Sequence, residues 1–79
     1  MATDLSPLIL DLAKQLVDHP DQVRVEARDG DTVLYELSVA PEDQGRIIGR
    51  EGRTIRSLRA VVQTAARKHG FRATLEVLE

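Results

Sequence analysis

Residues 47–55 read Ile47-Ile48-Gly49-Arg50-Glu51-Gly52-Arg53-Thr54-Ile55, and this stretch decides the fold. Two glycines separated by two polar residues interrupt a pattern that is otherwise helical. Because a glycine has no side chain, such a turn lets the backbone come very close to a ligand. A helix that begins after the turn would offer unpaired N–H groups and the positive end of its dipole to an anion. The surrounding arginines favour phosphate as that anion; they occupy positions 46, 50, 53, 56 and 59.

The charge of the chain is segregated, although the formal net charge is only −2. Residues 1–45 hold three basic and ten acidic side chains, which gives −7. Residues 46–72 hold eight basic side chains and the single acid Glu51, which gives +7. Local potential decides what docks on a surface, so the cationic third of the chain is expected to attract an anionic partner.

The composition is typical of a soluble globular domain, with 42% hydrophobic and 30% charged residues. A chain of 79 residues is expected to form a single domain over residues 1–79. The absence of cysteine excludes disulfides and thiolate metal sites. No apolar run approaches the roughly 18–20 residues of a membrane span, and Asp4 stands where a signal peptide carries a basic residue. We therefore expect a cytoplasmic protein.

The first half of the chain predicts a helix and a hairpin. Ser6-Pro7 is typical of an N-cap followed by the first helical residue, and apolar residues at helical spacing extend the helix over roughly 7–18. Apolar and polar residues alternate over 23–28 and again over 32–39, which predicts two strands. The turn residues Asp29-Gly30-Asp31 between them predict antiparallel pairing.

The second half predicts two consecutive helices and a strand. A short helix is expected to begin at Pro41 and to end at Gly49 in the left-handed conformation. The helix after Gly52 is amphipathic when positions are spaced by about 100°. Gly70 ends this helix, and alternation over 71–77 predicts a third strand. The expected apolar face comprises Ile55, Leu58, Val61, Val62, Ala65, Ala66 and His69, and the polar face comprises Arg53, Arg56, Arg59, Gln63 and Arg67.

The pattern I-I-G-x-x-G-x-x-I resembles the signature of the KH domain, a small module that binds single-stranded RNA. The order helix, strand, strand, helix, helix, strand is similar to type II KH domains, whose Gly-x-x-Gly turn joins two consecutive helices. This resemblance implies an α+β fold, with three helices on one face of a three-stranded mixed sheet. More narrowly, residues 17–23, 45–54 and 75–79 resemble the small bacterial KhpA family. Members look like RNA-binding proteins that form homodimers or pair with a larger KH protein, KhpB.

The resemblance implies that the chain binds single-stranded RNA, as a post-transcriptional regulator or RNA chaperone. Gly49 and Gly52 would admit the backbone of about four nucleotides. Bases would lie on an aliphatic groove built from Ile47, Ile48 and Ile55, because the aromatic residues Tyr35 and Phe71 are expected to face the core. Glu51 would repel phosphate unless it points to solvent or pairs with an arginine. The candidate RNA-binding residues are Arg46, Ile48, Gly49, Arg50, Glu51, Gly52, Arg53, Thr54 and Arg56.

These residues also allow other interpretations. Gly-x-x-Gly can be a plain helix–helix turn, and the distal Arg67, Lys68 and Arg72 can belong either to an RNA surface or to a solvated face. The spacing of the glycines fits neither a Walker A loop nor a dinucleotide fingerprint. His19 and His69 have no catalytic partner in sequence and are expected to be structural. No nucleophile with its base and no spaced metal cluster is present, so we expect no enzyme, no metal and no cofactor.

The second hypothesis is a protein–protein dimerisation module with a degenerate KH surface. Leu34 and Leu78 are apolar residues on an otherwise polar strand face, and the long helix is another candidate interface. Dimerisation and RNA binding are compatible, since two weak sites on one strand reinforce each other. We expect a homodimer at micromolar concentration, with the long helix or its flanks at the interface and residues 49–53 open to solvent.

Overall fold

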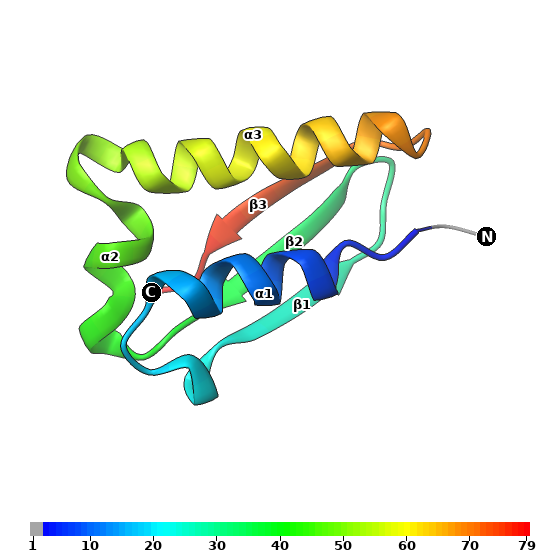
Figure 1. Cartoon of the computed structure of the whole chain (residues 1–79). Coiled ribbons are helices and arrows are strands. Elements are labelled where there is room, and N and C mark those ends of the chain that lie inside the picture. The colour runs from blue at the N-terminus through cyan, green and yellow to red at the C-terminus, as the bar shows by residue number, and fades with distance from the viewer. Residues whose placement is uncertain (1–2) are drawn as a thin grey trace.

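Three helices cover one face of a three-stranded sheet (Figure 1) in the computed structural model, which describes residues 3–79. The expected order of helices and strands is confirmed. None of the helices within residues 3–79 is long and apolar enough to cross a membrane. The helices are α1 (Ser6–Leu16), α2 (Gln44–Ile48) and α3 (Arg53–Lys68), and the strands are β1 (Arg24–Arg28), β2 (Val33–Ser38) and β3 (Ala73–Val77). Single 3-10 turns cover η1 (Pro20–Gln22), η2 (Pro41–Asp43) and η3 (Arg50–Gly52).

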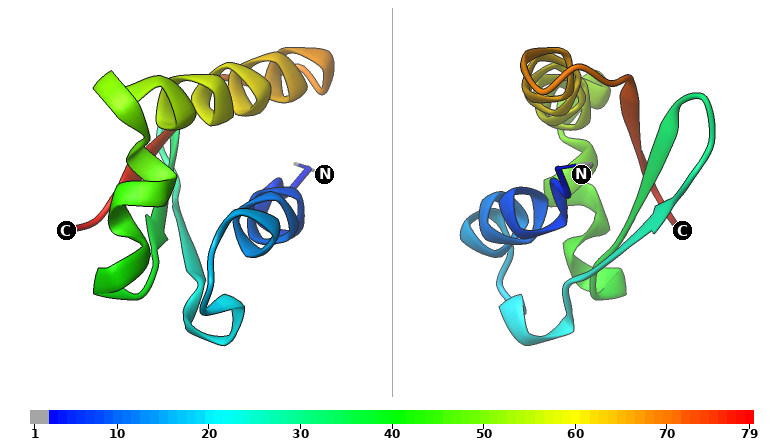
Figure 2. Two further views of the ribbon diagram at one scale, coloured as in Figure 1. Left: turned by 60° about the vertical axis from the view of Figure 1, so that its left-hand side comes forward. Right: turned by 90° about the vertical axis from the view of Figure 1, so that its right-hand side faces the viewer.

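The sheet is mixed, as the resemblance to type II KH domains implied. β2 lies in the centre, antiparallel to β1 and parallel to β3. Tyr35 faces Ala27 on β1 and Leu75 on β3 across these two pairings. All three helices lie on the same side of the sheet (Figure 2), so within residues 3–79 the other side of the sheet carries no helix. β1 and β3 are the two edges.

The core lies between the sheet and the helices. Strand residues that face the helices are buried, whereas their neighbours on the other side are more exposed. The Tyr35 hydroxyl accepts a hydrogen bond from the Leu5 N–H at 3.0 Å, so this buried oxygen is paired. Phe71 is half-buried and packs against the same cluster, so both aromatic residues face the core as expected. The buried cluster comprises Leu5, Ile9, Ala13, Val23, Tyr35, Leu37, Val39, Ile47, Val62, Ala66, Ala73 and Leu75.

The predicted ends of the first helices differ from the structure. α1 begins at Ser6 itself, and the Ser6 N–H donates to the carboxylate of Asp4 at 2.9 Å. The prediction of Ser6 as N-cap was therefore wrong, because the preceding aspartate supplies the acceptor. The segment that begins at Pro41 is divided into a 3-10 turn and α2, which begins only at Gln44.

Three residues on the expected apolar faces of the elements are exposed. Val61 keeps 45% of its surface exposed, although it lies on the expected apolar face of α3. The sheet covers only part of this apolar face of α3, and Val61 and His69 lie on the uncovered part. Ala27 is also exposed, because it lies near the end of the edge strand β1.

Candidate nucleic-acid interface

The connection between α2 and α3 is a tight turn that only its glycines permit. The Gly49 N–H donates to the Gly45 carbonyl at 2.8 Å and ends α2. The Gly52 N–H donates to the Gly49 carbonyl at 3.1 Å and closes the turn. Gly52 has the left-handed conformation, with φ 73° and ψ 18°. Gly49 ends α2 with the expected positive φ of 76°, but its ψ of 172° lies outside the left-handed helical region.

The beginning of α3 lies directly against Gly49. A Cβ atom on Gly49 would lie 2.3 Å from Oγ1 and 2.8 Å from the backbone nitrogen of Thr54. Real Cβ contacts are not this short, so any side chain at position 49 would push the turn away from α3. Thr54 therefore explains, together with the positive φ, why position 49 is a glycine. The two middle residues of the turn, Arg50 and Glu51, project from it, and both are exposed.

Glu51 is held by the arginines that follow it. Its backbone is left-handed, with φ 57° and ψ 26°, which is uncommon for a residue with a side chain. Its carboxylate lies 3.6 Å from Nη2 of Arg53, and its carbonyl accepts a hydrogen bond from Nη1 of Arg56 at 2.8 Å. The expectation that Glu51 can pair with a neighbouring arginine is confirmed. Because this ion pair is exposed, it contributes little stability, and another anion can displace it.

The N-terminus of α3 has the properties of an anion site. No acidic residue lies in the first turn of α3, and no side chain caps it. The Arg53 N–H donates to the Arg50 carbonyl, and the N–H groups that follow it at the start of α3 carry the positive end of the dipole. Arg50 projects beside this end, and among residues 3–79 it takes part in none of the ion pairs. Arg50 and Arg53 thus lie next to the helix end where the sequence predicted a phosphate.

Two other predicted residues are placed differently. Arg46 forms an ion pair with Asp18 at 3.2 Å, so its guanidinium is directed to the segment after α1. Ile47 is wholly buried, so the expectation that it lines a groove was wrong: it anchors α2 in the core. Ile48 and Ile55 remain half-buried and accessible from this side.

Arg59 is a residue of this surface that was not included among the candidate site residues. Its Nε donates to the carbonyl of Leu75 at 3.0 Å and so joins α3 to the free edge of β3. Arg56, one turn earlier in α3, lies on the same side of the helix. The position of Arg59 on the polar face of the helix was visible in the sequence, but its partner on β3 was not. The polar side of α3 therefore runs along the edge of the sheet.

A buried carboxylate fixes the start of α2. Asp43 is completely buried and accepts hydrogen bonds from the backbone N–H groups of Asp18 and His19, at 3.1 and 3.0 Å, and from Nδ1 of His19 at 3.0 Å. Burial alone would raise the pKa of Asp43, but these hydrogen bonds outweigh it and lower the pKa. The hydrogen bond to Asp43 raises the pKa of His19, assisted by the charges of Glu42 and Asp18.

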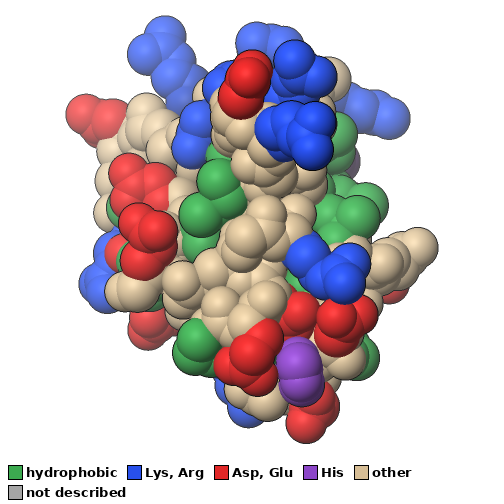
Figure 3. All heavy atoms as spheres, turned by 90° about the vertical axis from the view of Figure 1, so that its left-hand side faces the viewer, with side chains coloured by type: hydrophobic (Ala, Val, Ile, Leu, Met, Phe, Trp, Pro, Cys, Tyr) green, Lys and Arg blue, Asp and Glu red, His purple; other side chains and the backbone are tan. Residues whose placement is uncertain are grey.

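Charge is separated on the surface that carries the turn. In Figure 3, Lys and Arg side chains gather at the top, and Asp and Glu side chains are concentrated toward the bottom. The cations come from the turn and α3, as the segregation along the sequence predicted. Among residues 3–79, no cluster of three or more His, Asp or Glu side chains could hold a metal ion. The cations at the turn and along α3 suit binding of a polyanion.

Comparison with known proteins agrees with this geometry. The family described as KhpA/KhpB, KH domain, matches residues 6–77. RNA-binding protein KhpA of Halalkalibacterium halodurans is 46% identical over 76 residues, which cover 95% of this chain and 100% of that protein. RNA-binding protein KhpA of Chlamydia pneumoniae is 45% identical over 69 residues, 86% of this chain and 88% of that protein. RNA-binding protein KhpA of Aquifex aeolicus is 47% identical over 68 residues, 85% of this chain and 86% of that protein.

These matches cover nearly the whole chain and include both the turn and the sheet. The relatives carry the names of RNA-binding proteins and not of enzymes, in agreement with the expectation that this chain is not an enzyme. The α+β architecture and the place of the Gly-x-x-Gly turn are those expected of a type II KH domain. The chain belongs to the KhpA/KhpB family of KH domains.

Proposed function

We propose that this chain binds single-stranded RNA and that its Gly49–Gly52 turn receives the phosphate backbone. The single observation that carries the proposal is the turn itself. Gly49 packs against Thr54 without a side chain, and Arg50 and Arg53 stand beside the uncapped N-terminus of α3. Backbone N–H groups and guanidinium groups are the donors that hold phosphate. The relatives that carry the name RNA-binding protein support RNA as the polyanion.

Single strands suit this surface better than duplexes. Base edges of a single strand can reach the half-buried Ile48 and Ile55 and the backbone of β3, whereas paired bases cannot. Tyr35 is buried and Phe71 is half-buried against the core, so aromatic stacking contributes little. Such a site binds about four nucleotides weakly. A weak, short site is suited to post-transcriptional regulation or RNA chaperoning.

A loop variant tests the proposal. Arg50→Asp with Glu51→Asp places two carboxylates against phosphate at exposed positions, so the fold is retained and RNA binding is lost. Lys14→Asp, at an exposed position of α1, changes the net charge by the same amount and serves as the matched control. Circular dichroism and filter binding are measured on the same samples. Unchanged RNA affinity of the loop variant, or equal losses in loop and control variants, would remove the turn from the site.

We further propose that the chain acts as a homodimer or with a KhpB-like partner. Support comes from α3, where Val61 is 45% exposed and lies with Ala60, Thr64, Ala65 and Lys68 around a mostly apolar hollow of about 420 Å³. A second copy presents the same apolar surface and could cover it. This face includes none of the turn residues, so both copies could leave their turns open to one RNA strand and gain affinity.

Sedimentation equilibrium on the loop variant separates the two functions. If the dimer persists while RNA binding is lost, the module binds RNA as a dimer, which is the expected result. If the variant loses both properties, the turn is itself the protein interface and the dimerisation hypothesis is favoured over the RNA site.

A further inference from the structure

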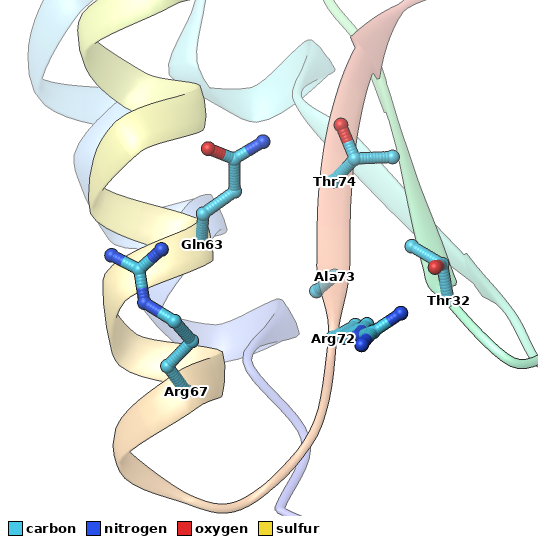
Figure 4. A pocket seen from close by; sticks show the side chains of 6 residues that line it. All are labelled: Thr32, Gln63, Arg67, Arg72, Ala73 and Thr74. Atoms are coloured by element: carbon cyan, nitrogen blue, oxygen red, sulfur yellow. The ribbon is translucent and has the colours of Figure 1, made fainter.

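A second cationic hollow lies at the far end of α3, away from the Gly49–Gly52 turn. It has a volume of about 430 Å³ and lies between α3, the start of β3 and the end of the β1–β2 connection. Figure 4 shows Gln63 extending from α3 on the side of β3, with Thr74 and Thr32 across from it, while the Arg67 side chain runs along α3 itself. Since a water occupies about 30 Å³ in the liquid, this hollow has room for a phosphate and its sugar. Its lining residues are Thr32, Gln63, Arg67, Arg72, Ala73 and Thr74.

The two arginines of this hollow lack acidic partners. Among residues 3–79, neither Arg67 nor Arg72 takes part in an ion pair, and both are exposed. Arg67 has only a long contact of 3.5 Å from Nη2 to the Thr64 hydroxyl on its own helix. Asp31 directly precedes the lining residue Thr32 in the sequence. Asp31 forms no ion pair with Arg67 or Arg72. The hollow is therefore a positive site without an internal counter-ion.

The other lining groups complement a sugar–phosphate chain. The Val33 N–H donates to the Arg72 carbonyl at 2.9 Å, so the backbone of Arg72 faces β2. Backbone groups alternate along a strand, so those of Ala73 face the free edge, as the Leu75 carbonyl does where it meets Arg59. Gln63 adds an amide, and the two threonines add hydroxyls that both donate and accept. Donors for phosphate and partners for ribose hydroxyls are thus present together.

A continuous polar stripe joins this hollow to the turn. Arg56, Arg59, Gln63 and Arg67 lie on one side of α3 at spacings of three and four residues, next to the edge of β3. From Gly52 to Arg67 the helix rises about 22 Å, at about 1.5 Å per residue. The hollow lies near the far end of this rise, so a segment of about four nucleotides centred on the turn does not reach it.

We propose that the Arg67–Arg72 hollow is a second backbone-binding site, which holds the sugar–phosphate of the same RNA strand beyond the nucleotides at the turn. The proposal rests on the RNA-binding function proposed above and extends its footprint along α3. RNA short enough to fill only the turn does not reach the hollow. Longer RNA reaches both sites and gains affinity from the second.

The test compares two RNA lengths on two variants. Fluorescence anisotropy is measured with labelled single-stranded RNAs of five and twelve nucleotides, over a range of salt concentrations. Arg67→Gln with Arg72→Gln removes the cations of the hollow. Lys14→Gln with Arg24→Gln removes the same charge from exposed positions of α1 and β1 and is the matched control.

The expected result is a loss confined to the long RNA. The hollow variant binds the twelve-nucleotide RNA on the order of tenfold more weakly than the wild type, because two charge-assisted contacts are lost. The slope of log affinity against log salt becomes shallower by about 1.4, at about 0.7 per phosphate for single strands. Binding of the five-nucleotide RNA is unchanged, and the control variant resembles the wild type with both RNAs.

Three outcomes overturn the proposal. If the hollow variant equals the wild type on the long RNA while both bind the short one, the second site is wrong and the turn site stands. If hollow and control variants weaken both RNAs equally, the arginines act only through net charge. If sedimentation equilibrium shows that the hollow variant has lost a dimer along with its affinity, the arginines belong to a protein interface. A wild type that binds neither RNA refutes the proposed function itself.

Discussion

Nδ1 of His19 lies 3.0 Å from Oδ2 of Asp43, and this hydrogen bond joins the segment after α1 to the residue before α2. The Asp43 carboxylate is completely buried, whereas the His19 ring is partly exposed. Nε2 of the same ring lies 3.7 Å from the carboxylate of Glu42, and Asp18 adds a further negative charge, itself paired with Arg46. The ring is therefore surrounded by acids, and α2 is held in place beneath the turn.

This pair predicts a dependence of stability on pH. The pKa of His19 is raised above its ordinary 6.5. The contribution of His19 to the free energy of unfolding is therefore complete below pH 6.5 and is lost as the pH rises through the folded-state pKa. The pKa of Asp43 is lowered from 3.8. The contribution of Asp43 to the free energy of unfolding is therefore present above pH 3.8 and is lost as the pH falls through the folded-state pKa. Urea unfolding should show greater stability near pH 5 than near pH 8.

A variant at His19 isolates the alkaline part of this profile. Asn at position 19 can place an amide donor near Oδ2 of Asp43 but does not titrate, so the free energy of unfolding of His19→Asn should change less between pH 5 and pH 8. An identical pH profile in wild type and variant would show that another group causes the change.

Gly49 and Gly45 offer a matched pair of substitutions in one short segment. In Gly49→Ala the added Cβ atom clashes with Thr54, and the residue must adopt a positive φ. This substitution should reduce the free energy of unfolding by about 1–3 kcal/mol. Gly45 lies in α2, and nothing lies within 4 Å of an added Cβ atom. Gly45→Ala should raise stability by about 0.5–1 kcal/mol, the usual gain in a helix. Urea unfolding of both variants measures the difference, and equal effects would refute the packing argument at Gly49.

Glu51 should weaken the affinity for RNA. Its carboxylate pairs with Arg53 and lies where phosphate is expected, so Glu51→Gln frees that arginine and removes a repulsive charge. Affinity should rise a few-fold, since exposed charge interactions are worth roughly 0.2–1 kcal/mol. Glu26→Gln on β1 is the control for net charge. A fall in affinity of the Glu51 variant, measured by anisotropy, would mean that the carboxylate itself contacts the RNA.

Self-association should depend on α3 and not on the open face of the sheet. Val61→Glu introduces a charge into the exposed apolar hollow, whereas Leu78→Glu introduces it beside β3, where Leu78 is 40% exposed. Sedimentation equilibrium should find a monomer for the Val61 variant and a dimer for the Leu78 variant. The reverse result would place the interface on the sheet.

The sequence predicted the order of elements and the turn, because hydrophobic periodicity and glycines report local backbone requirements, whereas the mixed sheet was implied by the resemblance to type II KH domains. It did not reveal the Asp43–His19 bond, because the partners are 24 positions apart and each also suits a turn or a helix end. Ile47 was expected in a groove and lies in the core, while Val61 was expected in the core and is exposed. Periodicity shows which side of a helix is apolar, but it does not show how much of that side the sheet covers.

Charge patterning located the cationic segment but not its internal pairing. The sequence could not distinguish Arg46, which pairs with Asp18, from Arg50, which has no such partner among residues 3–79. The pairing depends on how the end of α1 meets α2, which is a tertiary relationship. The sequence already separated the distal Arg67 and Arg72 from the arginines of the turn, but it did not show that α3 and β3 bring them around one hollow.

The central claim is that the Gly49–Gly52 turn holds the backbone of single-stranded RNA. The most direct measurement is an NMR titration of the labelled protein with a five-nucleotide RNA, which follows every backbone amide at once. The account predicts the largest shifts at residues 49–54, with α1 and β1 unaffected. Shifts centred on the open face of the sheet or on α1, with residues 49–54 unchanged, would contradict it.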